Sequence, residues 1–379
     1  MLLPFEVLAQ DERARTGRIE TRHGTIETPA FMTVGTRATV TGLDAEDLQR
    51  VQTQVVLGNT YHLMLRPGQE AFERVGGLHA FMGWSGPILT DSGGFQIFSL
   101  ASDRTISERG ARFKSYTDGR VHMLSPERSI AIQSALGSDI MMVLDVCLDS
   151  RSDEAAMRDA MERTHRWALR SLAAREDEGQ ALFAIVQGGV VPELREASAA
   201  FLTEHPFDGF AIGGLAVGEE RSRREEVTHY AAQLLPAERP RYLMGVGTPV
   251  DLLVAVGAGI DMFDCMLPTH LAWQGTAFTS TGRVRVKRAA LADADVPLDA
   301  DCPCLACTRF TRAYLHHLFA CKEPLGYRLV SLHNLTHYNR LMADARAAIR
   351  DGRYAAFAAD RIERIDRHEH SDKRIGAGR

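Results

Sequence analysis

The chain has 379 residues, of which 45% are hydrophobic and 25% are charged, so it is long enough to bury one large core. No stretch approaches the about 20 consecutive apolar residues that a membrane span requires, and the N-terminus turns polar too early for an export signal. A cytoplasmic location is therefore expected, in which the six cysteines would favour metal binding over disulfides. The formal net charge of −5 argues mildly against nucleic acid, although locally gathered basic residues could still hold an RNA loop.

Eight short apolar runs, each ending in a polar residue or a glycine, organise the chain as far as residue 264. Continuous apolar runs of this length are typical of strands that are buried on both faces of a parallel sheet. The runs cover residues 30–34, 55–59, 88–91, 140–145, 182–187, 210–214, 242–245 and 260–264. Helical patterns lie between several of them, at residues 157–172, 221–235 and 249–257.

This pattern predicts a (β/α)8 TIM barrel over residues 1–278, because eight strands with intervening helices in about 250 residues are the usual size of that fold. A doubly wound open sheet is the alternative. The barrel is favoured because Asp91, Asp145, Gln187 and Asp264 all fall at the carboxyl ends of predicted strands, which meet at one mouth. A hairpin near residues 101–125 is predicted as an insertion after the third strand.

The sequence changes character after residue 278. Residues 279–288 alternate between apolar and basic and are interpreted as an edge strand, which would offer Arg283, Arg285, Lys287 and Arg288. We expect a zinc-binding subdomain over residues 279–365, packed on the barrel. Residues 366–379 are nearly devoid of apolar side chains and are predicted to be a disordered tail.

A cluster of cysteines carries the prediction of a metal site. Cys302, Cys304 and Cys307, together with one histidine, would supply the four ligands of a closed tetrahedral zinc ion, which is a structural rather than a catalytic arrangement. The alternative is three buried, inert cysteines. Spacing does not decide which histidine takes part, since four are near enough: His316, His317, His333 and His337. The other cysteines, Cys147, Cys265 and Cys321, are expected in the core.

Three glycine turns fall at the predicted mouth: residues 91–96 (DSGGFQ), residues 187–189 (QGG) and residues 213–215 (GGL). Bare backbone N–H groups and side-chain amides suit the edge of a planar heterocycle, although tight turns are also ordinary in barrels. Two carboxylates at one mouth indicate chemistry at a glycosidic carbon, where one attacks and the other handles the proton of the leaving group. Asp264 and Asp91 are the natural pair, and Asp145 could bind the N–H groups of a guanine-like ring.

Several motifs together resemble bacterial tRNA-guanine transglycosylases, and the resemblance runs from about residue 4 to residue 365. The glycine turns carry it, as do MGVGTP at Met244–Pro249, FDCMLPT at Phe263–Thr269, CPCLAC from Cys302 and SLHNL at Ser331–Leu335. The resemblance implies exchange of the wobble guanine of GUN-anticodon tRNAs (for Asp, Asn, His and Tyr) for 7-aminomethyl-7-deazaguanine, in queuosine biosynthesis. It also implies a homodimer, in which one subunit holds the anticodon stem-loop, with the zinc region near the interface.

The same resemblance implies a role for each matching residue. Asp264 would be the nucleophile that holds the ribose covalently, and Asp91 the general acid/base. The base-binding residues would be Asp91, Phe95, Asp145, Gln187, Gly214, Leu215, Glu219 and Met244, with Phe95 and Met244 on the two faces of the ring and the Leu215 carbonyl at the aminomethyl group. The RNA-binding residues would be Gly245, Val246, Gly247, Thr269, His270 and Trp273. The zinc ligands would be Cys302, Cys304, Cys307 and His333.

The sequence departs from the family pattern in two places. His270 and Trp273 stand in the loop after Pro268-Thr269, where the family usually has arginines that grip the anticodon loop; Trp273 could stack on a base or pack in the core. Residues 145–149 read DVCLD in place of the usual DECTP. The alternatives are an enzyme of the same fold that incorporates queuine or another deazaguanine, a non-catalytic tRNA-binding subunit, and a barrel enzyme acting on a small metabolite, such as a decarboxylase.

Overall fold

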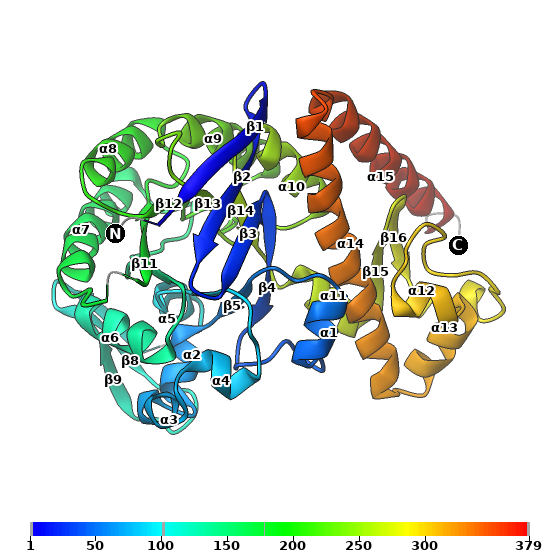
Figure 1. Cartoon of the computed structure of the whole chain (residues 1–379), viewed down its shortest axis with the longest axis horizontal. Coiled ribbons are helices and arrows are strands. Elements are labelled where there is room, and N and C mark those ends of the chain that lie inside the picture. The colour runs from blue at the N-terminus through cyan, green and yellow to red at the C-terminus, as the bar shows by residue number, and fades with distance from the viewer. Residues whose placement is uncertain (1–2, 101–102, 178, 377–379) are drawn as a thin grey trace.

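The computed structural model describes residues 3–100, 103–177 and 179–376, and it confirms the predicted barrel (Figure 1). Its closed parallel sheet runs in the order β10-β11-β12-β13-β14-β4-β5-β6. The barrel strand that comes last in the chain, β14, pairs with the one that comes first, β4, with Met262 beside Ala30. The eight strands are β4 (Ala30–Gly35), β5 (Val56–Gly58), β6 (Ile88–Thr90), β10 (Ile140–Met142), β11 (Ala181–Val186), β12 (Gly209–Ile212), β13 (Arg241–Leu243) and β14 (Met262–Asp264). Each lies within, or within one residue of, one of the eight apolar runs.

Helices surround the barrel wall, and their caps follow from the sequence. In α7 (Glu154–Ala173) the Asp153 side chain accepts from the Ala156 N–H, and the apolar residues predicted at helical spacing face the core. The others in this layer are α1 (Ala45–Arg50), α2 (Thr60–Leu65), α3 (Gln69–Val75), α4 (Leu78–Met82), α5 (Gly94–Leu100), α6 (Pro126–Leu136), α8 (Pro192–Thr203), α9 (Arg221–Gln233) and α10 (Pro249–Gly257). None of the described helices combines the length and apolar character needed to cross a bilayer.

An antiparallel sheet that the sequence did not predict covers the amino-terminal end of the barrel (Figure 1). It consists of β1 (Phe5–Asp11), β2 (Ala14–Thr21) and β3 (Gly24–Thr28). A buried ion pair fastens it: the Arg15 guanidinium donates to both carboxylate oxygens of Asp261, at 3.0 and 2.6 Å, immediately before β14. The opposite end of the barrel, where the strands finish, stays free for the site.

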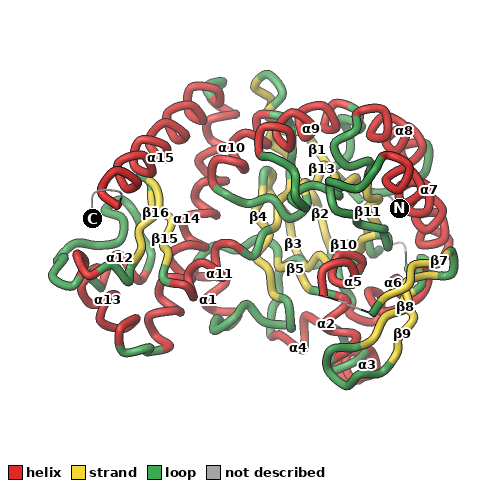
Figure 2. Tube along the Cα trace, turned by 180° about the vertical axis from the view of Figure 1, so that it is seen from behind, coloured by secondary structure: helices red, strands yellow, loops and turns green. Residues whose placement is uncertain are grey.

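The insertion after β6 is larger than the predicted hairpin. Three antiparallel strands form it, β7 (Arg104–Ser107), β8 (Gly110–Lys114) and β9 (Val121–Leu124), at the edge of the molecule beside α3 and α6 (Figure 2). Residues 101 and 102 lie outside the described residues. Phe113 and Leu124 are buried in the core beside α2, so the insertion is packed on the barrel.

The C-terminal region differs from the prediction in two respects. The single edge strand is a hairpin of β15 (Thr276–Thr279) and β16 (Gly282–Arg285), because Ser280 and Thr281 turn the chain. The predicted tail from residue 366 continues α15 (Tyr354–Gly376), whose Arg367–Glu363 and Arg364–Asp360 pairs at i,i+4 spacing support a polar helix; residues 377–379 are not described. The charged composition of this segment thus indicated disorder where the backbone continues a helix as far as Gly376.

The long helix α14 (Pro324–Arg350) joins this region to the barrel, running between the two in Figure 1. Its second half, including Tyr338 and Met342, belongs to the barrel core, with the Tyr338 ring 4.8 Å from that of Phe31 on β4. Its first half packs with the remaining elements, which are α11 (Leu267–Gln274), the short 3-10 turn η1 (Ala289–Leu291), α12 (Leu305–Arg309) and α13 (Arg312–Ala320).

Candidate active site

Predicted site residues follow six different barrel strands at their carboxyl ends, and Asn59, which was not predicted, follows a seventh. Asn59 follows β5, Asp91 follows β6, Asp145 lies three residues past β10, Gln187 follows β11, Gly214 lies beyond β12, Met244 follows β13, and Asp264 ends β14. Because the strands are parallel and the barrel is closed, these ends form one mouth.

Asp91 is held in a half-buried, donor-rich position at this mouth. Its carboxylate accepts from the Asn59 side-chain amide at 2.5 Å and from the Thr60 N–H at 2.8 Å. Burial raises the pKa of Asp91 to about 7, against the effect of those donors, and the charges of Asp264 and Asp145 act in the same direction as burial. An aspartate near half protonation at neutral pH can both give and take a proton.

Asp264 has a different environment. The Tyr242 hydroxyl and the Gly245 N–H both donate to its Oδ1, at 2.6 and 2.8 Å. Burial raises the pKa of Asp264 above the ordinary range, and these two hydrogen bonds lower it in part. Burial and the Asp264 charge raise the pKa of Tyr242 well above its usual value, so the phenol stays a neutral donor. Tyr242 was not predicted from the sequence, although the hydroxyl of a tyrosine inside an otherwise apolar strand indicates a buried hydrogen-bond donor.

Asp145 and Gln187 form a hydrogen-bonded pair of polar side chains at the mouth. The Gln187 amide donates to Asp145 Oδ2 at 2.8 Å, and the Ser92 hydroxyl donates to Oδ1 at 3.1 Å. Burial raises the pKa of Asp145 to about 6 despite these two bonds. Two glycines let the backbone approach this pair: a Cβ on Gly94 would lie 2.6 Å from Asp145 Oδ1, and one on Gly214, at φ +66°, would lie 2.4 Å from Gln187 Oε1.

A buried arginine, also missed from sequence, positions the two glycine turns. The Arg195 guanidinium on α8 donates to the carbonyls of Gly189, Val186 and Gly213, at 2.9, 2.7 and 2.8 Å. Burial lowers the pKa of Arg195 to about 10, which leaves it charged at neutral pH. A fully buried charge that contacts three carbonyls fixes the backbone of both turns.

Glu219 organises the next segment of the mouth. Its carboxylate accepts from the Ala216 N–H at 2.5 Å and from the Val217 N–H at 3.0 Å. Ala216 has φ +59°, so this turn is held in a conformation that alanine rarely adopts. Because N–H and C=O point in opposite directions across a trans peptide, the Leu215 carbonyl points away from Glu219.

The remaining predicted residues lie around this centre. Phe95, on the first turn of α5, is 47% exposed, and Met244 is half-buried. Gly245 is exposed, whereas Val246 and Gly247 are buried, and the Gly247 carbonyl accepts from the Tyr338 hydroxyl at 2.6 Å.

The segment after Pro268 is a helix and not the expected loop: α11 begins at Leu267, and Pro268 at its first turn starts it readily. The Trp273 ring stacks on Tyr327 with centroids 4.9 Å apart, yet its side chain stays 39% exposed. His270 is exposed one turn earlier, and the Thr269 hydroxyl donates to the Met266 carbonyl. Trp273 therefore packs on one face and leaves the other open.

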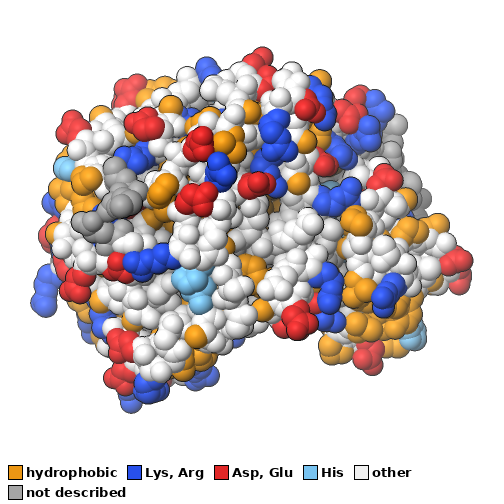
Figure 3. Space-filling model, viewed as in Figure 1, with side chains coloured by type: hydrophobic (Ala, Val, Ile, Leu, Met, Phe, Trp, Pro, Cys, Tyr) orange, Lys and Arg blue, Asp and Glu red, His pale blue; other side chains and the backbone are white. Residues whose placement is uncertain are grey.

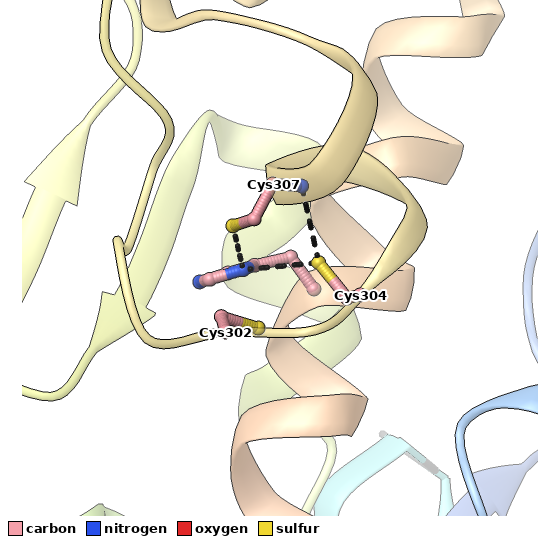
Figure 4. A group of neighbouring side chains, drawn as sticks. Cys302, Cys304 and Cys307 are labelled. Atoms are coloured by element: carbon pink, nitrogen blue, oxygen red, sulfur yellow. Dashed lines mark hydrogen bonds between the residues drawn. The ribbon is translucent and has the colours of Figure 1, made fainter.

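The predicted metal ligands lie close together at the N-terminal end of α12 (Figure 4). The sulfur atoms of Cys302, Cys304 and Cys307 and one nitrogen of His333 lie within 4.8 Å of one another. His333 Nδ1 is 3.2 Å from Cys307 Sγ and 3.5 Å from Cys304 Sγ, while its Nε2 lies 2.7 Å from the Phe278 carbonyl, which fixes Nδ1 as the free nitrogen. Three sulfurs and one imidazole are a donor set that fits zinc.

The other histidines and cysteines take different places. Of the four open choices, His333 is the one whose ring nitrogen lies among the three sulfur atoms, whereas His316 contacts the Val286 carbonyl and His317 lies beside Cys321. Cys147 is buried as predicted. Cys321 is exposed at the end of α13, which contradicts the expectation that it lies in the core; the last turn of a surface helix is open to solvent.

Comparison with known proteins gives a consistent result. The family model described as queuine tRNA-ribosyltransferase matches residues 10–367. The chain is 55% identical to a queuine tRNA-ribosyltransferase of Solidesulfovibrio magneticus over 352 residues, which cover 92% of this chain and 94% of that protein. It is 52% identical to one of Novosphingobium aromaticivorans (94% and 96% covered) and 50% identical to one of Pelotomaculum thermopropionicum (95% and 98% covered).

Proposed function

Because the chain belongs to the queuine tRNA-ribosyltransferase family, we propose that it replaces the wobble guanine of GUN-anticodon tRNAs by 7-aminomethyl-7-deazaguanine. It is a tRNA-guanine transglycosylase, an enzyme that exchanges the base attached to C1′ of a tRNA ribose. The observation that carries the finer proposal is the pair of carboxylates at the mouth: Asp91, with a pKa of about 7, and Asp264, with two donors on one oxygen.

The exchange proceeds by two displacements at the anomeric carbon. A carboxylate oxygen of Asp264 attacks C1′ of the ribose, the bond from C1′ to guanine breaks, and a proton from Asp91 goes to the departing base. The incoming base then gives its N9 proton to Asp91, attacks C1′, and releases the Asp264 carboxylate. Asp91 ends in the protonation state in which it began, so the cycle balances without a further reactant.

The base pocket follows from the same contacts. Asp145 would accept from the N–H groups on the Watson–Crick edge, and the Gln187 amide and the Gly214 N–H would bind the remaining polar atoms. Phe95 and Met244 would cover the two faces of the ring, since both keep exposed surface at the mouth. The Leu215 carbonyl, which points away from Glu219, would accept from the aminomethyl group.

The partners and the metal complete the proposal. The substrate would be bound as an anticodon stem-loop by one subunit of a homodimer in the cytoplasm, with Gly245, Val246, Gly247, Thr269, His270 and Trp273 near the RNA. The Cys302, Cys304, Cys307 and His333 cluster would hold one zinc ion, which ties the chain before α12 to α14 and takes no part in the exchange.

A radiolabelled-guanine exchange assay on bulk tRNA tests the proposal. We expect label to enter tRNA, 7-aminomethyl-7-deazaguanine to compete at low concentration, and queuine to compete poorly. Strong competition by queuine alone would instead assign the chain to the same-fold alternative. No exchange on tRNA known to contain the wobble guanine would favour the non-catalytic subunit and overturn the proposal.

A further inference from the structure

A second group of metal-ligating side chains lies at the end of the barrel opposite the mouth. His23 occupies the turn between β2 and β3, His79 lies on α4, and Asp139 immediately precedes β10. Three separate elements therefore bring these residues together, with 116 residues between His23 and Asp139 in the sequence. The group is far from the Cys302 cluster in the fold, and the exchange reaction gives it no role.

The geometry of the group is convergent. His23 Nδ1 is 2.8 Å from Asp139 Oδ1, and His79 Nε2 is 3.4 Å from Asp139 Oδ2. The two imidazole rings stack with centroids 3.5 Å apart and 20° between their planes. One ligand atom from each residue lies within 4.8 Å of the other two, which is the separation that a single ion can span.

Asp139 is prepared to act as an anionic ligand. Its side chain is 1% exposed, and its oxygens also accept the Ile88 N–H at 2.8 Å and the His23 N–H at 3.2 Å. The Asp139 carboxylate is thus fixed by two backbone N–H groups before any ion arrives, which limits the cost of ordering it.

The imidazoles leave the group open to solvent on one side. The His23 side chain is 36% exposed and that of His79 is 13% exposed. Figure 3 shows histidine side chains gathered on the face of the barrel that carries β1–β3. His79 Nε2 donates a hydrogen bond to the Gly86 carbonyl oxygen at 3.1 Å, and an ion bound at Nε2 would take the place of that hydrogen. An ion can therefore enter from solvent and keep a water ligand.

We propose that His23, His79 and Asp139 bind a divalent transition-metal ion of the zinc class, as a second site distinct from the thiolate cluster. Neutral imidazoles with one carboxylate suit zinc, nickel and cobalt, whereas a site without sulfur or a full set of oxygens suits neither copper(I) nor magnesium. The bound ion would tie the β2–β3 turn to α4 and to the start of β10. It would therefore fasten the amino-terminal sheet to the barrel at a point away from the Arg15–Asp261 ion pair.

Cobalt(II) titration of the purified zinc-containing protein tests the proposal. We expect one equivalent of Co²⁺ to bind with weak visible bands and without the intense near-ultraviolet bands of thiolate ligation, because this site has no sulfur. His23→Ala and His79→Ala should each lower the affinity at least tenfold, since even outer-shell changes cost about 10–100-fold in metal affinity. His205→Ala, which removes a half-buried histidine at the end of α8, is the matched control and should bind Co²⁺ as the wild type does.

A thermal-shift measurement gives a second readout that does not depend on spectra. Zinc or nickel added after the thiolate site is filled should raise the melting temperature of the wild type and of His205→Ala, but not of the double variant His23→Ala/His79→Ala. His23 lies in an exposed turn, so its replacement leaves the core unchanged. The proposal is overturned if the added Co²⁺ shows thiolate bands only, if no second equivalent binds, or if the double variant binds it as tightly as the wild type; the three residues would then be a hydrogen-bonded group alone.

Discussion

Asp264 carries both of its donors on one oxygen. Since the Tyr242 hydroxyl and the Gly245 N–H reach Oδ1, the plane of the carboxylate is fixed and Oδ2 is the oxygen that we expect to attack. The same donors oppose the effect of burial and keep the group more acidic than burial alone would leave it. The nucleophile is therefore oriented by two neutral donors, which offset in part the effect of burial on its pKa.

The Asp264→Asn variant should fold normally and lose exchange. An amide is a poor nucleophile at an anomeric carbon, so guanine incorporation should fall by several orders of magnitude. The amide oxygen can still accept from Tyr242 and Gly245, and the melting temperature should stay within a few degrees of the wild type. Asp118→Asn, at an exposed turn of the insertion, is the control. Near-normal turnover by Asp264→Asn would remove Asp264 from the catalytic role.

Asp91 gives a prediction about stability. Its pKa is about 7 in the folded protein against an ordinary value of 3.8, so between these values the folded state binds more protons than the unfolded state. The free energy of unfolding contributed by this group therefore falls as pH rises through that window. Between pH 5 and pH 8 the loss is about 2 kcal/mol.

Asp91→Asn removes this titration. The variant should gain stability relative to the wild type on going from pH 5 to pH 8, by about 2 kcal/mol, while losing exchange activity. Urea unfolding of both proteins at the two pH values measures the difference. An equal stability difference at both values would show that Asp91 is ionised throughout and would weaken its assignment as the general acid.

Residues at the mouth differed in how far the sequence could predict them. Asp91, Asp145, Gln187 and Asp264 were predicted because each ends an apolar run. Arg195 was not, since a charge on a predicted helix is normally a solvated residue, and only the fold shows that it contacts three carbonyls. At the opposite end of the barrel, His23, His79 and Asp139 were also missed, because they are distant from one another in sequence and no short motif connects them.

At the scale of elements, the barrel strands were the most predictable part of the chain. A strand buried on both faces is apolar throughout, and this local pattern survives without knowledge of the neighbours. The sheet β1–β3 was missed because its strands mix apolar and charged residues and lie partly exposed outside the barrel; no residue of β1 is buried. The turn at Ser280 was missed because β15 and β16 continue one alternating pattern across it.

The zinc cluster links α12 to α14, and its removal should loosen both. Purified protein should contain about one zinc ion per chain at the thiolate site, and Cys304→Ala should lose it. The apolar cluster around Phe319 and Leu329 is small, so without the metal this region should melt several degrees earlier and protect fewer amides. Cys321→Ala, an exposed cysteine outside the cluster, is the matched control and should keep its zinc. Elemental analysis that finds the metal retained in Cys304→Ala would contradict the assigned ligands.

For the whole molecule, the negative net charge opposes the binding of the negatively charged tRNA. A net charge of −5 repels tRNA at long range, so binding has to rely on local positive charge and on stacking. On α11, His270 and Trp273 stand where the related enzymes usually carry arginines. The indole rests on Tyr327 and keeps an open face, which suits stacking on an unpaired base.

Trp273→Arg and His270→Arg should therefore change how tRNA binding depends on salt. A phosphate-contacting arginine adds to the salt slope, whereas a stacked tryptophan adds almost nothing, so each variant should steepen the plot of log affinity against log salt by about 0.7–0.9. The guanidinium can keep the contact with Tyr327, and exchange of the base itself should persist. Gln10→Arg adds the same charge on β1, at the opposite end of the barrel, and should leave the slope nearly unchanged.

Parallel lines for the wild type and all three variants at pH 8 would mean that α11 does not face the phosphates. The RNA would then be held elsewhere, with the exposed basic residues Arg283, Arg285, Lys287 and Arg288 as the next to replace.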